Sequence, residues 1–474
     1  MAQRRRETAQ KVELPFGFSP RSYQEDLYAA LDRGLRGLPG GIKRAACCWH
    51  RRAGKDLAML NYIVKESWRR PGVYYHLLPT YTQAKRVIWD GRDDKERSFL
   101  DYIPKEMIKS KNSTELKIEF TNGAIYQLIG TDHFDSIVGP NPVGCVFSEY
   151  ALQNPQAWKL ISPILLSNKG WAVFIFTPRG KNHAYRLFKA AQDYPDQWYS
   201  SLLTVDDTRV VNPEEIKQDI KMGVIDEETA QQEYWCSFTS PMSGAYYSRL
   251  LEKAEAAGRI TSVPWEPNAD VQTWWDIGIG DSTAIWFLQQ VGRELRMIDY
   301  YENRGFGIDH YAKMLKEKDY VYDAHNLPFD AEDKELGTGK SIAEMLGMFN
   351  VGKIRIVEKL TVEQGIQAAR AIIPKVWFDK EKCKDGLDAL MNYRCEYDDK
   401  REVFKQDPLH DWSSHAADAF RYFAVGYKDL RPVENRYAVI DFNPFDPRNP
   451  EDMRKAEKFT EMQNQAITEF DVFP

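Results

Sequence analysis

Apolar runs in the first half of the chain alternate with segments in which apolar residues recur at helical spacing. This alternation predicts a mostly parallel β-sheet with helices on both of its faces. A sheet of this kind binds ligands at the carboxyl ends of its strands. Expected helices include residues 55–67 and 82–90, and the expected strands are residues 44–49, 73–78, 117–120, 124–129, 144–147 and 172–176.

The second half starts with three short apolar runs separated by turns, which predict a three-stranded antiparallel meander. Helical and strand-like segments then alternate, and this order is typical of an RNase H-like domain. The meander is expected at residues 271–277, 284–290 and 295–300, followed by strands at 320–324 and 353–357 and by helices at 308–318, 341–349, 362–372 and 411–425.

Turn-forming residues divide the chain further. Pro and Gly residues concentrate between the two halves, and the last stretch is rich in Pro, Asn and charge. We therefore expect a first domain at residues 1–240, a linker at 241–268, a second domain at 269–430 and an extended tail at 431–474.

The composition is that of a globular protein. Of the 474 residues, 43% are hydrophobic and 28% are charged, which excludes a wholly disordered chain. No apolar run reaches the ~18 residues that a membrane span needs, and the amino terminus lacks the apolar core of a secretory signal. The 64 basic and 70 acidic residues leave a net charge of −6, which argues against a uniformly basic DNA-binding protein but allows local basic channels. Six cysteines without C-x-x-C spacing indicate reduced thiols.

A loop with a Gly-Lys pair, residues 50–56 (HRRAGKD), connects the strand at 44–49 to a helix. This context is typical of a phosphate-binding P-loop, in which backbone N–H groups face the phosphates and the lysine adds a positive charge. The standard pattern is broken at Trp49, which replaces a glycine, and at Asp56, which replaces Ser or Thr. A surface turn is the alternative interpretation. The ATP contacts expected from the loop are Arg51, Arg52, Ala53, Gly54, Lys55 and Asp56.

An apolar strand that ends in a carboxylate, residues 143–149 (VGCVFSE), has the form of a Walker B strand. Ser148 stands where the Mg²⁺-binding aspartate is normal, and Glu149 stands where a catalytic glutamate would orient the attacking water. The hydroxyl and the carboxylate expected near Mg²⁺ would then have exchanged places, as Asp56 and Ser148. The alternative for Glu149 is an acid that caps the next helix.

Two further segments fit an ATP-driven motor. Gln24 lies among aromatic residues before the P-loop and is expected to contact adenine, with a plain helix start as the alternative. Thr177 follows the strand at 172–176 in a Thr-Pro-Arg-Gly sequence, where the state of the γ-phosphate could be coupled to motion; Arg179 is a lesser candidate there. Arg51 and Arg52 could act as arginine fingers in cis or contact DNA.

Three aspartates occupy positions that converge in an RNase H-like fold, on the first strand, after the fourth strand and on the last helix. They are Asp276, Asp330 and Asp418. Together they can hold two Mg²⁺ or Mn²⁺ ions, which activate a water and stabilise the leaving oxygen of a phosphodiester. Lesser candidates are Asp281 and Asp323 as ligands, and Asp411 and His415 as partners of the ligands on the helical face of Asp418.

The order and the residues of these motifs resemble the large terminase subunit of tailed bacteriophages. The resemblance rests on the Gln24 segment, HRRAGKD (50–56), VFSEYA (146–151), TPRG (177–180), WWDIGIGDSTAIWF (274–287), LPFDAEDKELGTGKS (327–341) and SSHAADAFRY (413–422). It implies an α/β protein with an N-terminal P-loop (RecA-like) ATPase domain followed by an RNase H-like nuclease domain. Two positions differ from many relatives: Val138 stands where Arg often precedes Gly139, and Phe329 stands where His is frequent.

The resemblance also implies a function. The chain would use ATP and Mg²⁺ to move viral double-stranded DNA into a procapsid through the portal protein, and would cut concatemeric DNA as a metal-dependent endonuclease. Lys55 would contact phosphate, Glu149 would be catalytic and Thr177 would lie in the coupling motif. The implied partners are a small terminase subunit and further copies of the chain in a homo-oligomeric ring on the procapsid. The implied location is the host cytoplasm, with no membrane and no permanent place in the virion.

Two other functions account for parts of the sequence. A DNA-repair helicase-nuclease would need a second RecA-like domain, for which the chain leaves no room between its P-loop core and the nuclease scaffold. A catalytically degenerate scaffold protein, associated with the capsid or the portal, is supported only by the altered Walker positions Asp56 and Ser148.

Overall fold

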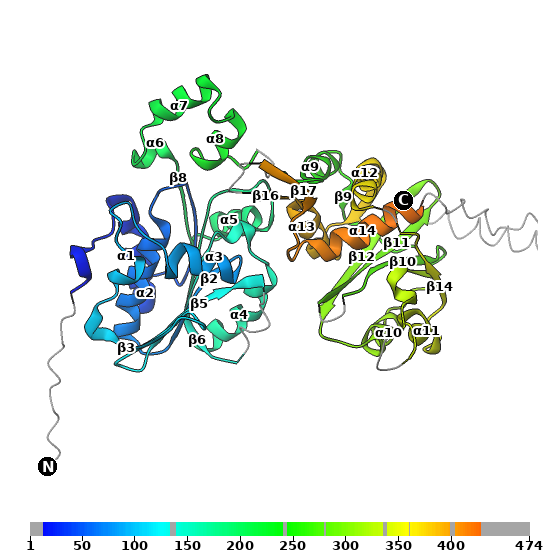
Figure 1. Ribbon diagram of the computed structural model, residues 1–474, viewed down its shortest axis with the longest axis horizontal. Helices are drawn as coiled ribbons and strands as arrows, with labels where there is room; N and C mark the ends of the chain where they lie inside the picture. The colour runs from blue at the N-terminus through cyan, green and yellow to red at the C-terminus, as the bar shows by residue number, and fades with distance from the viewer. Residues whose placement is uncertain are drawn as a thin grey trace, which may run out of the picture. The chain divides into compact units, whose positions relative to one another are not determined.

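The computed structural model describes residues 13–132, 139–239, 244–278, 281–334, 339–359, 361–398 and 403–427 (Figure 1). The tail expected at residues 431–474 and Val138 lie outside these ranges. The described residues form two large sheets and one two-stranded sheet. Within the same ranges, no helix is long and apolar enough to cross a membrane.

The first sheet has eight strands. They are β1 (Arg44–Trp49), β2 (Val73–Leu78), β3 (Ile108–Asn112), β4 (Lys117–Phe120), β5 (Ile125–Gly130), β6 (Pro142–Ser148), β7 (Trp171–Phe176) and β8 (Tyr199–Leu203). Their order is β3-β4-β5-β2-β6-β7-β1-β8, and all neighbours from β5 to β8 are parallel, whereas β3 and β4 form an antiparallel edge. The mostly parallel sheet predicted from the alternating pattern is therefore confirmed.

Helices accompany this sheet in the order that the sequence predicted. They are α1 (Ser22–Leu35), α2 (Lys55–Arg69), α3 (Tyr81–Ala84) with a π-helical turn (Lys85–Trp89), α4 (Gln156–Ser167) and α5 (His183–Asp193). After β8 come three short helices with a small apolar core of their own, α6 (Val205–Thr208), α7 (Pro213–Met222) and α8 (Glu227–Glu233).

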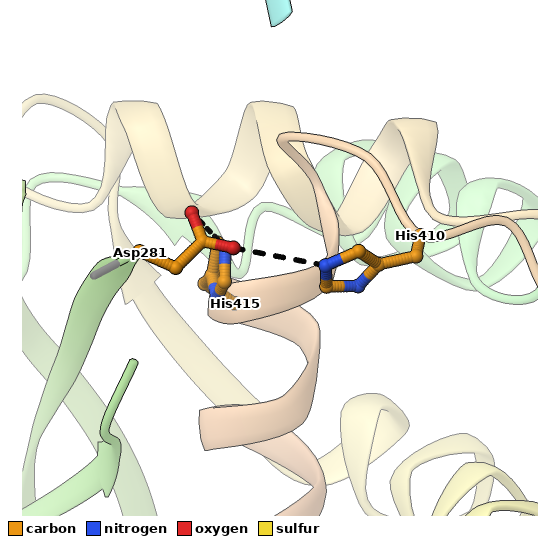
Figure 2. A group of neighbouring side chains, drawn as sticks. All are labelled: Asp281, His410 and His415. Atoms are coloured by element: carbon orange, nitrogen blue, oxygen red, sulfur yellow. Dashed lines mark ion pairs between the residues drawn. The ribbon is translucent and has the colours of Figure 1, made fainter. Parts of the chain in front are cut away.

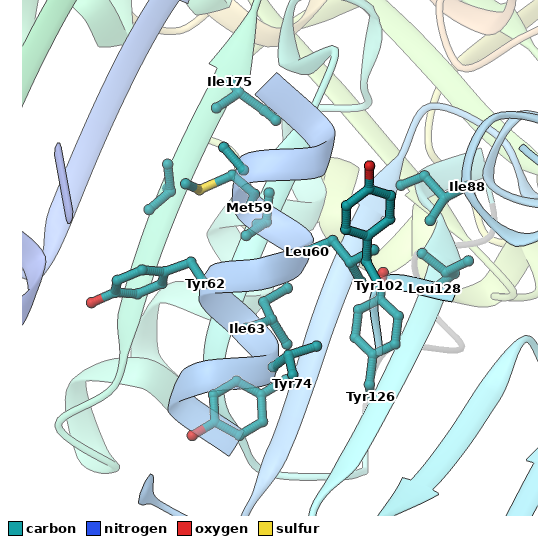
Figure 3. Close-up of a cluster of buried hydrophobic side chains, with 14 of the residues drawn as sticks. Met59, Leu60, Tyr62, Ile63, Tyr74, Ile88, Tyr102, Tyr126, Leu128 and Ile175 are labelled. Atoms are coloured by element: carbon teal, nitrogen blue, oxygen red, sulfur yellow. The ribbon is translucent and has the colours of Figure 1, made fainter. Parts of the chain in front are cut away.

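Helix α2 packs against one face of the sheet (Figure 3). Its residues Met59 and Ile63 are fully buried, in one cluster with Tyr74 of β2 and Ile175 of β7. Each such side chain contributes about 1.5–3 kcal/mol through burial. This packing fixes α2 on the sheet, and it thereby fixes the loop that enters the helix from β1.

A glycine lets two central strands of this sheet carry a large aromatic side chain between them. A Cβ on Gly144 of β6 would lie 2.5 Å from the ring of Trp171 in β7. Trp171 is fully buried and makes edge-to-face contact with Tyr62 of α2, with ring centroids 5.3 Å apart. The absence of a side chain at Gly144 is thus required for the packing of α2.

The second sheet has seven strands. They are β9 (Ile260–Thr261), β10 (Val271–Asp276), β11 (Ser282–Val291), β12 (Glu294–Arg304), β13 (Tyr322–Leu327), β14 (Lys353–Ile356) and β15 (Val376–Asp379), in the order β14-β13-β10-β11-β12-β15-β9. Strands β10, β11 and β12 form the antiparallel meander, and β13 and β14 continue the sheet in parallel beside β10. This is the arrangement that an RNase H-like domain requires, and it confirms the predicted fold class.

The remaining elements complete the second half. The helices are α9 (Ser248–Ala256), α10 (Ile308–Glu317), α11 (Ile342–Met348), α12 (Val362–Ile372), α13 (Lys384–Asn392) and α14 (Ser414–Gly426), and β16 (Cys395–Asp398) pairs with β17 (Val403–Pro408).

Two expectations differ from the structure. The segment expected as a linker at 241–268 contains α9 and β9, and β9 extends the second sheet by pairing with β15. The last helix starts at Ser414 and not at Asp411. Asp411 lies before it and accepts hydrogen bonds from the backbone N–H and the hydroxyl of Ser413, as a residue at a helix entrance does.

Candidate active sites

The loop between β1 and α2 has the backbone geometry of a phosphate-binding loop. Gly54 adopts a left-handed conformation with φ of 73° at the start of α2, which glycine reaches without steric cost. Ala53 is fully buried and its N–H donates to the carbonyl of His50 at 3.3 Å. Helix α2 therefore presents its first backbone N–H groups at the end of β1, where an anion can be bound.

Lys55 joins the ends of three adjacent strands. Only 6% of its side chain is exposed, and its Nζ donates to the carbonyl of Trp49 at 3.1 Å and to Thr177 Oγ1 at 3.1 Å. Nζ also lies 3.9 Å from Glu149 Oε1. Trp49 ends β1, Thr177 follows β7 and Glu149 follows β6. The structure thus brings together three residues that the sequence predicted for one ATP site.

Asp56 and Ser148 are in direct contact, as the proposed exchange of hydroxyl and carboxylate requires. The Ser148 hydroxyl donates a hydrogen bond to Asp56 Oδ1. His76, buried in β2, places Nε2 3.6 Å from the same oxygen. Burial alone would raise the pKa of Asp56, but His76, Ser148 and the charge of Lys55 lower it below its usual value. Asp56 is therefore held as a carboxylate beside the P-loop.

Glu149 is held at the mouth of this site by a left-handed backbone conformation with φ of 53°. Its side chain is 32% exposed. A short 3-10 helix (Tyr150–Leu152) follows, but the Glu149 side chain makes no capping hydrogen bond to it. The alternative of a helix-capping acid is therefore not what the geometry shows.

Gln24 lies against the P-loop from helix α1. Its buried Nε2 donates to the carbonyl of Ala53 at 2.9 Å, and its Oε1 accepts a hydrogen bond from the backbone N–H of Arg21 at 3.0 Å. The same side chain thus caps α1 and fastens the loop, so both interpretations of the sequence describe part of its surroundings. Contact with adenine remains a prediction.

The arginines of the ATPase half are tied to one acid. We call this group the Glu233 clasp: Glu233 at the end of α8, with Arg179 Nη1 2.5 Å from Oε1 and Arg51 Nη1 3.8 Å from Oε2. The backbone N–H of Arg51 also donates to the carbonyl of Glu233 at 2.8 Å. Arg52 is exposed, with φ of 71°. The clasp connects the P-loop and the segment after β7 to the helices that follow β8.

In the second sheet, Asp276 ends β10 and meets helix α14. Its Oδ2 lies 3.2 Å from His415 Nδ1. Burial raises the pKa of Asp276 to about 6, although His415 acts in the opposite direction. Cross-strand pairing places Ala284 beside Asp276 and Glu302 beside Ala284, so the three residues point to the same face of the sheet. The short alanine side chain leaves room between the two acids.

Asp330 and Asp418 approach the same end of the sheet. Strand β13 runs parallel to β10 with Asn326 beside Trp274, so Asp330 lies just beyond the strand ends where Asp276 is found. Asp418, on α14, accepts hydrogen bonds from Arg421 Nε at 3.0 Å and Nη2 at 2.5 Å. Burial raises the pKa of Tyr422, and the charges of all three aspartates raise it further. The three predicted carboxylates therefore converge around one tyrosine.

Asp281 and two histidines form a second group beside Asp276 (Figure 2). Asp281 Oδ1 lies 3.3 Å from His415 Nε2, and Asp281 Oδ2 lies 3.7 Å from His410 Nε2. Burial alone would lower the pKa of His415, but Asp276 and Asp281 raise it to about 9. His415 thus bridges two carboxylates.

Two lesser candidates lie elsewhere. Asp323 stands near the start of β13, where it accepts a hydrogen bond from Gln272 at 2.9 Å and pairs with Arg355 at 3.2 Å. The parallel register puts it at the other end of the strands from Asp276. Asp411 pairs with Arg394 at 3.1 Å, ahead of the helix that carries Asp418.

Four residues of these sites were not predicted from the sequence: His76, Glu233, Glu302 and His410. The signal for His76 is a polar residue within the apolar run of β2, because a buried polar side chain needs a partner. Glu302 occupies a corresponding place in β12. Glu233 and His410 lie in segments without such a signal, and only their contacts in the folded chain identify them.

The comparisons with known proteins agree with the motifs. No family model matches the chain. The chain is 22% identical over 349 residues to the terminase large subunit of Escherichia phage T5, with 66% of this chain and 72% of the relative aligned. Similar solved structures are the large terminase of a thermophilic bacteriophage, with 15% identity, a TM-score of 0.37 and 87% of this chain and 100% of that chain covered, and the ATPase domain of the Thermus phage P74-26 large terminase, with 20% identity, a TM-score of 0.39 and 47% and 95% covered. The similarity to the phage T5 protein supports a large terminase subunit, as the resemblance predicted.

Proposed function

We propose that the chain is a large terminase subunit that hydrolyses ATP to move double-stranded DNA into a procapsid and cuts the DNA with a metal-dependent nuclease. The observation that carries this proposal is the convergence of Lys55, Glu149 and Thr177 at the ends of three neighbouring strands. The same chain carries three carboxylates at one end of an RNase H-like sheet. This combination fits a motor that also cuts its substrate.

The ATPase half supplies each group that phosphoryl transfer needs. Lys55 and the N–H groups at the start of α2 bind the phosphates, and Glu149 orients the attacking water. Asp56 and Ser148 would hold the Mg²⁺ ion that accompanies ATP, which neutralises phosphate charge when bound. Thr177 contacts Lys55, so the segment after β7 can respond to the occupancy of the phosphate site.

The positive charge that completes this site is best supplied by a neighbouring subunit. Arg51 and Arg179 already pair with Glu233, and among the described residues only one P-loop sheet is present. A ring of copies, each completing the site of the next, satisfies both observations. The helicase-nuclease alternative, which closes two RecA-like domains over ATP within one chain, is not favoured.

The nuclease half supplies a metal-binding end of a sheet. Asp276, Asp330 and Asp418 would hold two Mg²⁺ or Mn²⁺ ions, which activate water for attack on a phosphodiester when bound. His415 orients Asp276 through its Nδ1, and Arg421 orients Asp418. Contacts to phosphates rather than bases suit a motor that must pass any sequence.

The proposed partners follow from this role. They are double-stranded DNA, the portal protein through which it passes, and a small terminase subunit that selects the site of cutting. The proposed place of action is the host cytoplasm, without a permanent position in the virion. The inactive-scaffold alternative loses its support, because the two altered Walker positions contact each other and together retain one hydroxyl and one carboxylate.

An in vitro packaging assay with procapsids, ATP and DNA tests the motor. We expect Glu149→Gln to abolish DNA uptake, whereas Asp276→Asn retains uptake and loses cleavage of plasmid DNA in Mg²⁺ or Mn²⁺. Asp323→Asn is a matched control, since it removes a carboxylate of the same domain that lies away from the site. Undiminished uptake by Glu149→Gln would contradict the motor assignment, and undiminished cleavage by Asp276→Asn would contradict the nuclease assignment.

A further inference from the structure

Asp281, His410 and His415 direct three metal-binding groups at one point (Figure 2). One carboxylate oxygen and one nitrogen from each imidazole lie within 4.8 Å of one another. They come from separate segments: Asp281 precedes β11, His410 follows β17, and His415 is in the first turn of α14. Such convergence of two histidines and a carboxylate is a recurring ligand set for transition metals.

The spacing fits a single ion. Ligand atoms bound to zinc at about 2.1 Å in tetrahedral geometry lie about 3.4 Å apart. The two oxygen-to-nitrogen distances, from Asp281 to His415 and to His410, are 3.3 and 3.7 Å. Small rotations of exposed side chains bring both to the ideal value, because 75% of the His410 side chain and 42% of the Asp281 side chain are exposed.

An independent observation also points to a metal ligand. A histidine that binds a metal nearly always donates its other ring N–H to a carboxylate or carbonyl, which fixes the tautomer and the direction of the ring. His415 has this partner: its Nδ1 lies 3.2 Å from Asp276 Oδ2, while Nε2 faces Asp281. The ring is 9% exposed and cannot turn away easily. Its Nε2 is therefore presented to the ion position by the fold.

We infer that Asp281, His410 and His415 bind a transition-metal ion, with Zn²⁺ as the best-fitting species, at a site separate from the ions of the three-aspartate centre. Two imidazoles select against Mg²⁺, which prefers oxygen ligands, and favour zinc. The ion takes the place of the proton on His415 Nε2. Three protein ligands leave a fourth position for water, as in open zinc sites.

The ion would connect the loop after β10 to the segment before α14. Both segments border Asp276, so a metal here holds His415 in the orientation that supports that carboxylate. The two centres would then share one link, His415, and loading of the histidine site would stabilise the arrangement of the proposed nuclease centre. The inference itself rests on ligand geometry and does not require the chain to be a nuclease.

Zinc binding to the purified full-length chain tests the site directly. After treatment with a chelator, the protein is titrated with Zn²⁺ against a chromogenic chelator in excess Mg²⁺, which occupies the carboxylate centre. We expect one zinc per chain, and at least about tenfold weaker binding in His410→Ala. His410 is largely exposed, so the variant should fold; its thermal unfolding midpoint provides the check.

His310→Ala is the matched control, because it removes a histidine of the same domain that contacts Tyr301 instead of Asp281. We expect it to bind zinc as wild type does. Absence of zinc binding by wild type, or equal affinity in His410→Ala and wild type, would overturn the inference. Plasmid cleavage measured in parallel reports on the nuclease proposal, so a failure of either one is recognised separately.

Discussion

The contact between Asp56 and Ser148 leads to a reversal experiment. If these residues have exchanged the usual positions of hydroxyl and carboxylate, each single reversal should impair ATP hydrolysis and the double reversal should restore part of it. Asp56→Ser leaves two hydroxyls and no carboxylate near the phosphates. Ser148→Asp leaves two carboxylates in contact, because the native side chains already form a hydrogen bond.

The size of the effect follows from the surroundings. Loss of one preorganised electrostatic group in an active site typically costs about 10²–10³ in kcat, which we expect for Asp56→Ser. In Ser148→Asp, two charges about 4 Å apart repel by about 4 kcal/mol at an effective dielectric constant of ~20. One carboxyl should therefore take up a proton and distort the site. In the double variant the repulsion is absent, and His76 still faces the pocket.

The assay is steady-state phosphate release by the purified chain with DNA and varied Mg²⁺, analysed as a double-mutant cycle. We expect the double variant to exceed Asp56→Ser by at least about tenfold, a coupling of about 1.4 kcal/mol. Asp56→Ala should be inactive and serves as the reference for loss of the carboxylate. A double variant no faster than the slower single variant, or full activity in Asp56→Ala, would refute the exchange.

Three further predictions concern catalysis, packing and pH. Glu149→Gln should lower ATP hydrolysis by about 10²–10⁴ because it removes the base, yet leave binding of a fluorescent ATP analogue intact; loss of both would indicate a folding defect instead. Gly144→Ala should lower the free energy of unfolding in urea by about 1–3 kcal/mol, since the new methyl group meets Trp171 at 2.5 Å; an unchanged midpoint would show that the ring moves freely. His183 is buried with Nε2 2.8 Å from the carbonyl of Tyr150, and burial lowers its pKa to about 3. The unfolded chain binds a proton near pH 6.5 and the folded chain does not, so stability should fall by about 1.4 kcal/mol per pH unit from this group as the pH drops below 6.5, and His183→Gln should show a shallower loss.

Much of the fold could be predicted because its strands are continuous apolar runs between turn residues. The bounds of β1, β2, β4 and α12 agree with the predicted ranges. Strand β8 escaped prediction because it lies at the edge of the sheet and its sequence, YSSLL, is only half-buried. Strand β9 has two residues and no pattern of its own. Its place depends on β15, which follows it by more than a hundred residues.

The site residues divide in the same way. Lys55, Ser148 and Asp276 each stand at or directly after an apolar strand, so sequence position alone indicates that they meet a ligand. Glu233 and His410 are ordinary polar residues in their own segments. Their roles come from partners distant in the chain, such as Arg179, which lies 54 positions before Glu233. Asp411 illustrates the reverse error, because regular spacing suggested a helical face that the helix does not reach.

The Glu233 clasp has a consequence for how this half of the molecule meets an anion. Arg51 and Arg179 both begin with a carboxylate partner, so a phosphate group that approaches either guanidinium must compete with Glu233 for it. Binding is then an exchange of one anion for another. A released Glu233 also frees the end of α8, which follows β8 through two short helices. Occupancy of the P-loop and the position of these helices thereby become alternatives within a single charge balance.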